Sequence, residues 1–540
     1  MQKRIVILFF LTVGSLCALT FKIISINAGD YAEVATYNNS KSLKIAESRG
    51  TIYDTNLEPM VNVEDEYAVA MKPTSIALSS VEKYVGAERM AILREELAQG
   101  LPVLFRVPQR IEGGDDIRVV SYKRRYADEQ YATHLVGYID GDGVGVSGLE
   151  KSYDDYLSEA SGSLRAVFYV DALGRNLGGA EIDILEDGYN LTRGVVLTID
   201  MNVQRVIEDT LERYGWESGS AVAMDPNTGE IKAMVSAPDY DPNNVADSLE
   251  AEGSPLLNKA LQAYSVGSTF KVVVAAAALE EDSAYADFKR TCSGSVMCGD
   301  TEFKCFDGTV HGEQTMKDAL VHSCNTYFIE LAREIGAKKI IATAEKMGFG
   351  KQNLLASGIT AKPGSLPDAE SVDTLGELAN LGFGQGGLLA TPVQLATSFA
   401  SVANSGTYVV PYLFRGYVDD DGDFSETSES RSARSVGTLG GTRIISRNTS
   451  VTLSSMLASA VAENERIRSE KVTAAGKTAT AQTGQFVDGV EVCHTWFAGW
   501  YPADNPELVI VLMKESGVTG VSDCGPVFKN IVDSLTSDGK

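Results

Sequence analysis

The sequence is poor in the residues that metal and nucleic-acid sites usually need. It contains four histidines and seven cysteines, with no Cys-x-x-Cys pair and no histidines paired at metal-ligand spacing. We therefore expect no metal site, zinc included. The formal net charge of −26 argues against nucleic-acid binding, which needs a basic patch. There is also no internal repeat and no long low-complexity tract, so we expect an ordinary folded protein.

Six cysteines lie beyond the N-terminal apolar run, and the sequence leaves their state open. They could form disulfides in an oxidising compartment, and isolated structural thiols are an equally good alternative. From placement alone we expect Cys493 to pair with Cys524, and Cys292 to pair with Cys305 or Cys298. Connectivity does not follow from sequence, so these pairs are hypotheses.

Only one apolar run is long enough to cross a membrane. Residues 5–26 are almost wholly apolar, and the single interruption, Lys22, can extend its amine to the membrane interface. Lys3 and Arg4 precede the run, so we expect residues 1–4 in the cytoplasm and the rest of the chain outside. The rival interpretation is a cleaved signal peptide, but no convincing small-x-small cleavage site follows the run.

The rest of the chain is too long for one ordinary domain, and its texture changes near Val195. Before that point, short strand-like runs mix with helical stretches. After it, helices are predicted at 202–214 and 527–535, and strands occur near both ends, which favours a sheet completed by distant segments. The expected strands are 195–199, 221–224, 231–236, 472–475, 495–500 and 508–513. The turn 225–229 (DPNTG) between the second and third of these is a strong hairpin signal.

The first chemical motif is Ser268-x-x-Lys271, which precedes an apolar helical run. Side chains three residues apart share one face of a helix, so a lysine with a depressed pKa could take the serine proton. The same spacing recurs at Ser80–Lys83 and Ser537–Lys540. One match alone is therefore more often an N-cap serine with a surface lysine.

The second motif is Ser323-Cys324-Asn325, in a helical context. The hydroxyl and the amide could relay a proton and hold a peptide carbonyl. A buried turn that breaks a helix is the plain alternative. We expect Cys324 to pack as a small apolar group.

The third motif is residues 476–481, Gly-Lys-Thr-Ala-Thr-Ala, in a strand. Small residues allow a substrate backbone to approach the strand edge, where Lys477, Thr478 and Thr480 can contact it. The alternative is an exposed edge strand whose charge discourages aggregation.

Ser-x-x-Lys, Ser-x-Asn and Lys-Thr-small in this order are far more specific together, and they are known from penicillin-binding proteins and class A β-lactamases. The chain resembles class B penicillin-binding proteins over nearly its whole length. The further segments that carry this resemblance are 49–54 (RGTIYD), 124–126 (RRY), 134–137 (HLVG), 148–150 (GLE), 224–230 (MDPNTGE) and 382–386 (GFGQG).

The resemblance implies the reaction of a D,D-transpeptidase that cross-links peptidoglycan, with β-lactams as inhibitors and no cofactor. It implies that Ser268 is the acylated nucleophile, Lys271 its base, and Ser323 and Asn325 a proton relay and substrate clamp. The donor would be a stem peptide ending in D-Ala-D-Ala, the acceptor the amine of another stem peptide.

The resemblance also implies how the third motif is used. Lys477 and Thr478 would recognise the terminal carboxylate, with Ala479 and Thr480 alongside the substrate. The backbone N–H groups of Ser268 and Thr480 would form the oxyanion hole. Ala479 departs from the family's usual glycine, and we expect its methyl to narrow the site.

The implied fold is a multidomain α+β protein. It has a single transmembrane helix, an elongated mixed α/β pedestal (dimerisation) domain at 27–190, and a transpeptidase domain at 191–540 with a five-stranded antiparallel sheet flanked by helices. No wall-binding PASTA module is expected at the C-terminus. The implied partner is a glycosyltransferase of the shape, elongation, division and sporulation (SEDS) family.

Two other functions stay open. A D,D-carboxypeptidase or β-lactamase-like hydrolase would use water in place of the acceptor amine, although the long pedestal and anchor argue against a free-standing hydrolase. A β-lactam sensor or a catalytically weak scaffold would regulate the glycosyltransferase instead. A sensor needs a cytoplasmic part, and we expect only about four residues before the anchor.

Overall fold

The computed structural model describes residues 2–27, 39–160, 162–177, 179–428, 430, 441–487 and 489–537. The chain forms two compact units that alternate along the sequence. Gly50–Val61 and Asp128–Ser158 lie within the region predicted as 27–190 but pack with the second unit. The first unit comprises Met1–Arg49, Asn62–Ala127 and Glu159–Leu191, and the second comprises Gly50–Val61, Asp128–Ser158 and Thr192–Lys540.

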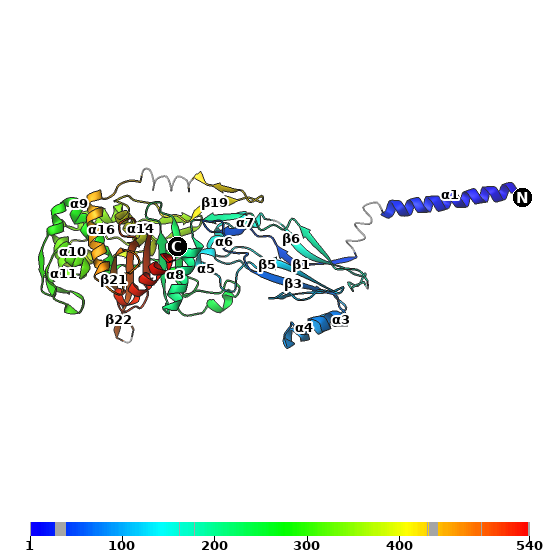
Figure 1. Ribbon diagram of the computed structural model, residues 1–540, viewed down its shortest axis with the longest axis horizontal. Helices are drawn as coiled ribbons and strands as arrows, with labels where there is room; N and C mark the ends of the chain where they lie inside the picture. Colours follow the sequence, from blue (N-terminus) through cyan, green and yellow to red (C-terminus); the bar gives the residue numbers. More distant parts are fainter. Residues whose placement is uncertain are drawn as a thin grey trace. The chain divides into compact units, whose positions relative to one another are not determined.

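The N-terminal apolar run forms one continuous helix, α1 (Gln2–Asn27) (Figure 1). Its stretch Lys3–Ser25 has a mean hydropathy of 2.2 and is long and apolar enough to cross a membrane. This helix fits a single-pass membrane protein, as the sequence predicts.

The first unit holds two small antiparallel sheets that share one apolar core, and the second sheet also packs against a further core. One has the strand order β1-β6-β7, and its core includes Phe168. The other has the order β4-β3-β5 and is covered by α3 and α4 around Met71 and Leu93. The elements are β1 (Ser40–Glu47), β3 (Asp65–Met71), α3 (Ser75–Val81), α4 (Ala87–Ala98), β4 (Val103–Val107), β5 (Ile117–Lys123), β6 (Ser163–Tyr169) and β7 (Asp183–Asp187).

The second unit is built on a five-stranded antiparallel sheet of order β10-β9-β23-β22-β21. Strands from distant parts of the chain complete it, which confirms the expected sheet. The hairpin predicted around residues 225–229 joins two neighbouring strands, as expected. The strand predicted at 472–475 is longer and starts later. The strands are β9 (Gly219–Met224), β10 (Ile231–Ala237), β21 (Ala475–Val487), β22 (Val490–Tyr501) and β23 (Leu508–Lys514).

Helices cover both faces of this sheet, so its strands are apolar on both sides. Phe497 and Ile510 face α8 (Met201–Arg213) and α18 (Gly525–Leu535) in one core. Alternate residues such as Trp496 are equally buried on the opposite face. In Figure 1, α14 (Pro392–Ala403) and α16 (Arg447–Ala462) lie on one side of β21 and α8 on the other.

Other helices surround the start of α9 (Lys271–Glu281), which is buried along most of its length. Its apolar residues occur on all sides of the helix, as in a core helix, and not on one face only, as in an amphipathic surface helix. The neighbouring helices are α10 (Met316–Val321), α11 (Asn325–Ile335), α12 (Ala337–Lys346) and α13 (Leu375–Phe383). A further small sheet of the second unit is β2 (Thr51–Tyr53), β8 (Gly194–Leu197), β19 (Phe414–Val418) and β20 (Phe424–Glu426).

Candidate active site

Ser268 lies in the short 3₁₀ turn Gly267–Phe270 that leads directly into α9. The side chain is partly exposed, although both neighbouring residues are buried. Among the described residues, the Ser268 hydroxyl has no hydrogen-bond partner. The preceding strand β11 (Tyr264–Ser265) is held by the indole of Trp496, which donates to the Ser265 carbonyl at 2.9 Å. The turn therefore presents a free hydroxyl from a fixed backbone.

Two glycines allow other segments to reach this turn. Gly267 has φ +53, and a Cβ there would stand 3.0 Å from the Cβ of Ala481 on β21. Gly384, at the end of α13 with φ +82, would place a Cβ 2.0 Å from the Gly267 carbonyl oxygen. Only glycine fits both positions. The Gly-Phe-Gly-Gln-Gly motif is thus a backbone contact of the serine turn, a role that the sequence alone did not predict.

Lys271 links the first motif to the second. It is fully buried, and its Nζ donates to the Ser323 carbonyl at 2.7 Å, the Ser323 Oγ at 3.2 Å and the Asn325 Oδ1 at 2.6 Å. Burial, assisted by the charge of Lys477, holds the pKa of Lys271 well below 10.5. A lysine in this state can exist as a neutral amine, which is the form that accepts a proton.

Ser323 lies in the turn between α10 and α11, whereas Asn325 is the first residue of α11, so the alternative of a helix-breaking turn describes the backbone of Ser323 only. Ser323 has φ +55, a strained left-handed conformation for a non-glycine residue. Asn325 accepts from Lys271 through its oxygen, and its Nδ2 donates to the Lys304 carbonyl at 3.0 Å. This second bond fixes the orientation of the amide.

The third motif runs along β21, the edge strand of the sheet, beside the serine turn. Thr478 and Thr480 are partly exposed, whereas Lys477 is buried. Burial lowers the pKa of Lys477 to about 7, and its Nζ donates to the Thr478 carbonyl at 2.9 Å. The strand thus presents the hydroxyls of Thr478 and Thr480 to a ligand, and the buried amine of Lys477 can gain or lose a proton near neutral pH.

Ala479 lies on the buried side of this strand, the side that also carries Lys477 and Ala481. The residue is only 3% exposed. It alternates with the partly exposed threonines, so its methyl group points into the protein, because successive side chains of a strand face opposite sides. An effect of this methyl group on substrate or β-lactam binding stays a prediction.

The Ser-x-x-Lys match at 80–83 does not form a comparable site. Ser80 donates to the Ile76 carbonyl within α3, and Lys83 lies over the ring of Tyr84 at the surface. Lys83 is a surface lysine, as in the plain alternative, but Ser80 lies near the end of α3 and is not its N-cap. The match at 537–540 ends outside the described residues.

The predicted disulfides are wrong, since all seven cysteines are free. The sulfurs of Cys292 and Cys305 lie 3.7 Å apart, and Cys298 instead accepts from Arg333 at 3.1 Å. Cys493 lies on β22, whereas Cys524 is buried against Thr495.

The structure also brings together four side chains that could hold a metal ion, a group that the expectation of no metal site did not anticipate. Cys292, Cys305, His311 and Cys324 place their ligand atoms within 4.8 Å of one another. Sequence spacing missed this group because four separate segments contribute to it. Cys324 is buried as expected, but its sulfur lies near other polar atoms.

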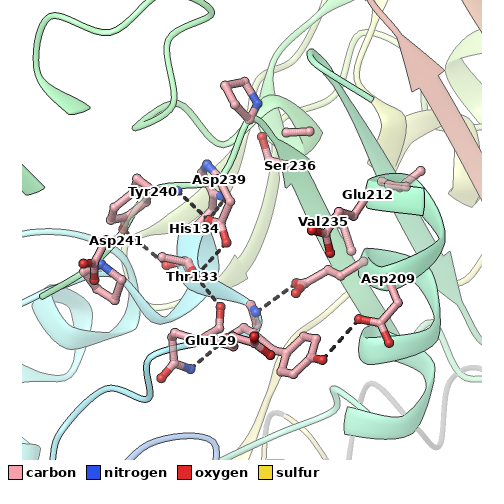
Figure 2. Close-up of a pocket in the computed structure, with 18 of the residues that line it drawn as sticks. Glu129, Thr133, His134, Asp209, Glu212, Val235, Ser236, Asp239, Tyr240 and Asp241 are labelled. Carbon is pink, nitrogen blue, oxygen red and sulfur yellow. Dashed lines mark hydrogen bonds and ion pairs between the residues drawn. The ribbon is translucent and has the colours of Figure 1, made fainter. Parts of the chain in front are cut away.

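A pocket of about 590 Å³ lies elsewhere in the second unit, and none of the predicted catalytic residues lines it (Figure 2). Its wall carries Glu208 of α8, whose Oε1 accepts from Gln204 at 2.6 Å and from the Ala132 N–H at 2.9 Å. Burial raises the pKa of Glu208 to about 8 and that of Asp239 to about 6. Burial lowers the pKa of His134 to about 4.

Glu208→Gln should flatten the loss of thermal stability between pH 5 and pH 8. Because the folded state raises the Glu208 pKa from 4.5 to about 8, this carboxyl stabilises the fold at low pH and loses that contribution as pH rises. Glutamine keeps the accepting oxygen and removes the titration. We expect the variant to melt roughly 2–4 °C above the parent at pH 8 and near it at pH 5.

Calorimetry across this pH range measures the difference, with Glu212→Gln as the matched control on the same helix and pocket wall. Asp239 titrates in all three proteins, so only its charge interaction with Glu208 differs between them. If the melting temperatures of the parent and Glu208→Gln changed with pH by the same amount, the raised pKa of Glu208 would be contradicted.

A comparison with protein families matches residues 219–533 to the penicillin binding protein transpeptidase domain. Among curated proteins, stage V sporulation protein D of Bacillus subtilis is 31% identical over 77% of this chain and 63% of its own length. The match thus spans less than two thirds of that relative. Peptidoglycan D,D-transpeptidase PbpA of Mycolicibacterium smegmatis is 29% identical over 77% of this chain and 85% of its own.

Solved structures agree on the fold. The D,D-transpeptidase domain of a peptidoglycan glycosyltransferase from Eggerthella lenta aligns with a TM-score of 0.64 at 25% identity, over 92% of this chain and 99% of that one. Peptidoglycan and β-lactams are ligands that fit this family. The family match covers more than half of the chain, and the name of the relative PbpA carries the same activity. The chain therefore belongs to the penicillin-binding protein transpeptidases, in the class B group of peptidoglycan D,D-transpeptidases.

Proposed function

We propose that this protein cross-links peptidoglycan through an acyl-enzyme on Ser268. The observation that carries the proposal is the placement of Lys271, a buried lysine with a lowered pKa that bonds to both Ser323 and Asn325. One amine thus connects the serine helix to the second motif.

In the first half-reaction, the Ser268 oxygen attacks the carbonyl of the penultimate D-Ala, and Lys271 takes the hydroxyl proton. The backbone N–H groups of Ser268 and Thr480 stabilise the oxyanion. The C–N bond to the last D-Ala then breaks. Ser323 passes a proton to the leaving nitrogen and receives the proton held by Lys271 in return, and free D-Ala departs.

In the second half-reaction, the amine of another stem peptide attacks the ester. Its proton returns through the lysine to the Ser268 oxygen as the ester bond breaks, and the product is a cross-linked peptide. Asn325 holds the substrate amide. Lys477, Thr478 and Thr480 hold the carboxylate end along the edge of β21, with Ala479 lining the strand from its buried side.

The membrane arrangement follows from the same proposal. Residues 5–26 anchor the chain with residues 1–4 in the cytoplasm, and the catalytic region 191–540 lies outside, where peptidoglycan is found. Residues 27–190 serve as the pedestal. A SEDS-family glycosyltransferase is the partner that would supply uncross-linked glycan strands.

The proposal is tested by incubating the full-length protein in detergent with a pentapeptide-bearing donor and an acceptor amine. We expect a cross-linked dimer together with about one D-Ala released per bond formed, since the half-reactions are coupled. Release of D-Ala without dimer at saturating acceptor would identify a carboxypeptidase. Neither product, with a well-folded protein, would favour the scaffold.

A further inference from the structure

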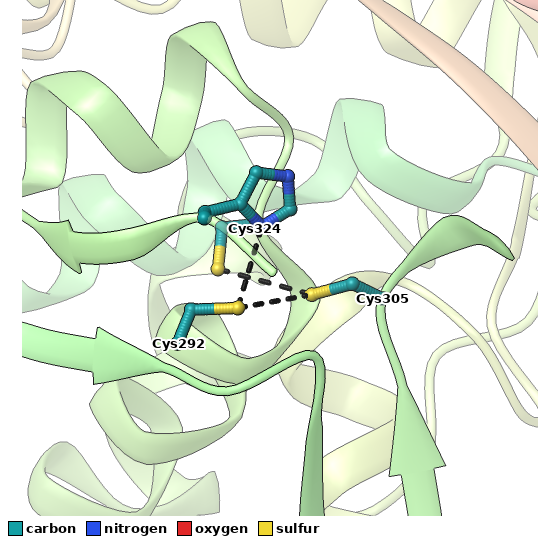
Figure 3. A group of neighbouring side chains, drawn as sticks. Cys292, Cys305 and Cys324 are labelled. Carbon is teal, nitrogen blue, oxygen red and sulfur yellow. Dashed lines mark hydrogen bonds between the residues drawn. The ribbon is translucent and has the colours of Figure 1, made fainter. Parts of the chain in front are cut away.

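Four metal-ligand side chains converge in the segment that joins α9 to α11 (Figure 3). Cys292 ends β12 (Arg290–Cys292), and Cys305 directly follows β14 (Thr301–Lys304). His311 precedes β15 (Gly312–Gln314), and Cys324 precedes α11. Pairing of β12 with β15 sets Cys292 beside Gly312, so the fold itself brings the first and third ligands together.

The distances within this Cys3His cluster are those of ligands around one tetrahedral ion. Zinc–sulfur bonds of about 2.3 Å place two thiolates at tetrahedral angles about 3.8 Å apart. The sulfur of Cys305 lies 3.7 Å from that of Cys292 and 3.9 Å from that of Cys324. The Cys292 sulfur is 3.3 Å from the Nδ1 of His311. A disulfide would need sulfurs at about 2.05 Å.

The segment around the cluster has little apolar core of its own. Its strands are three or four residues long, and several of its large apolar side chains face solvent, including Met297, Phe306 and Val310. By contrast, the three cysteines are at most 2% exposed. Small elements that cannot bury enough apolar surface are typically held by a metal or by disulfides.

Further contacts orient the cluster. The Gly294 N–H donates to the Cys292 sulfur at 3.4 Å, and the Thr326 hydroxyl lies 3.3 Å from the Cys324 sulfur. The ring of His311 stacks on that of His322 with their centroids 5.8 Å apart. Such outer contacts are what fix ligand orientation in structural metal sites.

We propose that Cys292, Cys305, His311 and Cys324 bind one structural zinc ion. On binding, the three thiols release their protons to solvent, and the neutral imidazole coordinates through Nδ1. Three thiolates and one imidazole in a closed tetrahedral arrangement are the donor set of a structural zinc site. The ion cross-links β12, the end of β14, the start of β15 and the start of α11.

This site adjoins the catalytic turn, and the next step rests on the proposed function. Cys324 is the residue between Ser323 and Asn325. Cys305 follows Lys304, whose carbonyl accepts a hydrogen bond from the side-chain amide of Asn325. Zinc bound to Cys324 and Cys305 would therefore restrain both the second motif and the segment that accepts the Asn325 hydrogen bond. This restraint would keep the Asn325 oxygen in contact with Lys271.

The direct test is the metal content of the full-length protein, purified in detergent under reducing conditions. We expect about one zinc per chain, as four ligands of one site require. Cys292→Ala and Cys305→Ala should lose it. Cys298→Ala and Cys524→Ala are the matched controls, because both thiols are buried outside the cluster, and these variants should keep the metal.

Two measurements guard against loss of metal through misfolding. His311→Cys should retain zinc where His311→Ala does not, because a fourth thiolate can replace the imidazole. Cobalt added to metal-stripped parent protein should show the absorption of a tetrahedral thiolate complex. Absence of zinc from the reduced parent after zinc is added back would overturn the proposal, as would equal zinc in the parent and Cys305→Ala.

Acylation by benzylpenicillin separates this proposal from the proposed function. We expect His311→Ala to acylate about 10–100-fold more slowly than the parent and His311→Cys to recover most of the rate. A parent that holds zinc without acylating would refute the function but keep the site. A parent that acylates normally without ever holding zinc would refute the site alone.

Discussion

Ser268→Ala should abolish the covalent adduct with benzylpenicillin. The parent protein, incubated with the drug, should gain the mass of one whole β-lactam molecule, because ring opening loses no atoms. The Ser268 hydroxyl is the partly exposed group at the start of α9 that has no competing hydrogen bond among the described residues. Its removal leaves no oxygen for the acyl bond, so the loss should be complete.

Intact mass spectrometry of the full-length protein gives the readout, and limited proteolysis then locates the modified peptide. Ser265→Ala is the matched control, since Ser265 is three residues away and contributes its backbone carbonyl, not its hydroxyl, to the bond with Trp496. An adduct that persists in Ser268→Ala would place the nucleophile elsewhere. An unmodified parent with the drug still intact would favour the scaffold.

The large features of this fold follow from the sequence because they depend on local patterns. The apolar run predicts α1, and the alternating and turn signals around residues 225–229 predict the β9–β10 hairpin. The pairing of these strands with β23 was predicted only in outline. The two segments that leave the N-terminal region for the second unit, 50–61 and 128–158, have no such local signal.

The site divides in the same way. Three motifs were recognisable by residue order, and the structure brings Lys271 into contact with Ser323 and Asn325. The Cys3His cluster was missed, because its ligands come from separate segments that meet only after β12 pairs with β15. The buried direction of the Ala479 side chain also depended on the register of β21, which the sequence pattern did not fix.

Lys271→Arg should slow acylation by about 10²–10⁴-fold, the range typical for loss of a general base. Arginine keeps the positive charge and can still donate to Asn325, but it stays protonated at any working pH and cannot accept the serine proton. In the parent, burial lowers the Lys271 pKa, so the neutral base is present above that lowered pKa. The acylation rate should therefore fall as pH decreases through it.

The variant should lack this acid limb, because its residual rate no longer depends on deprotonation of a lysine. Stopped-flow acylation across pH measures both effects. Lys259→Arg is the matched control, since Lys259 is also buried, also has a pKa lowered by burial, and donates to the Gly253 carbonyl away from the motifs. A Lys271→Arg rate within about tenfold of the parent would assign the serine proton to another base, and the remaining candidate in contact with this lysine is the hydroxyl of Ser323.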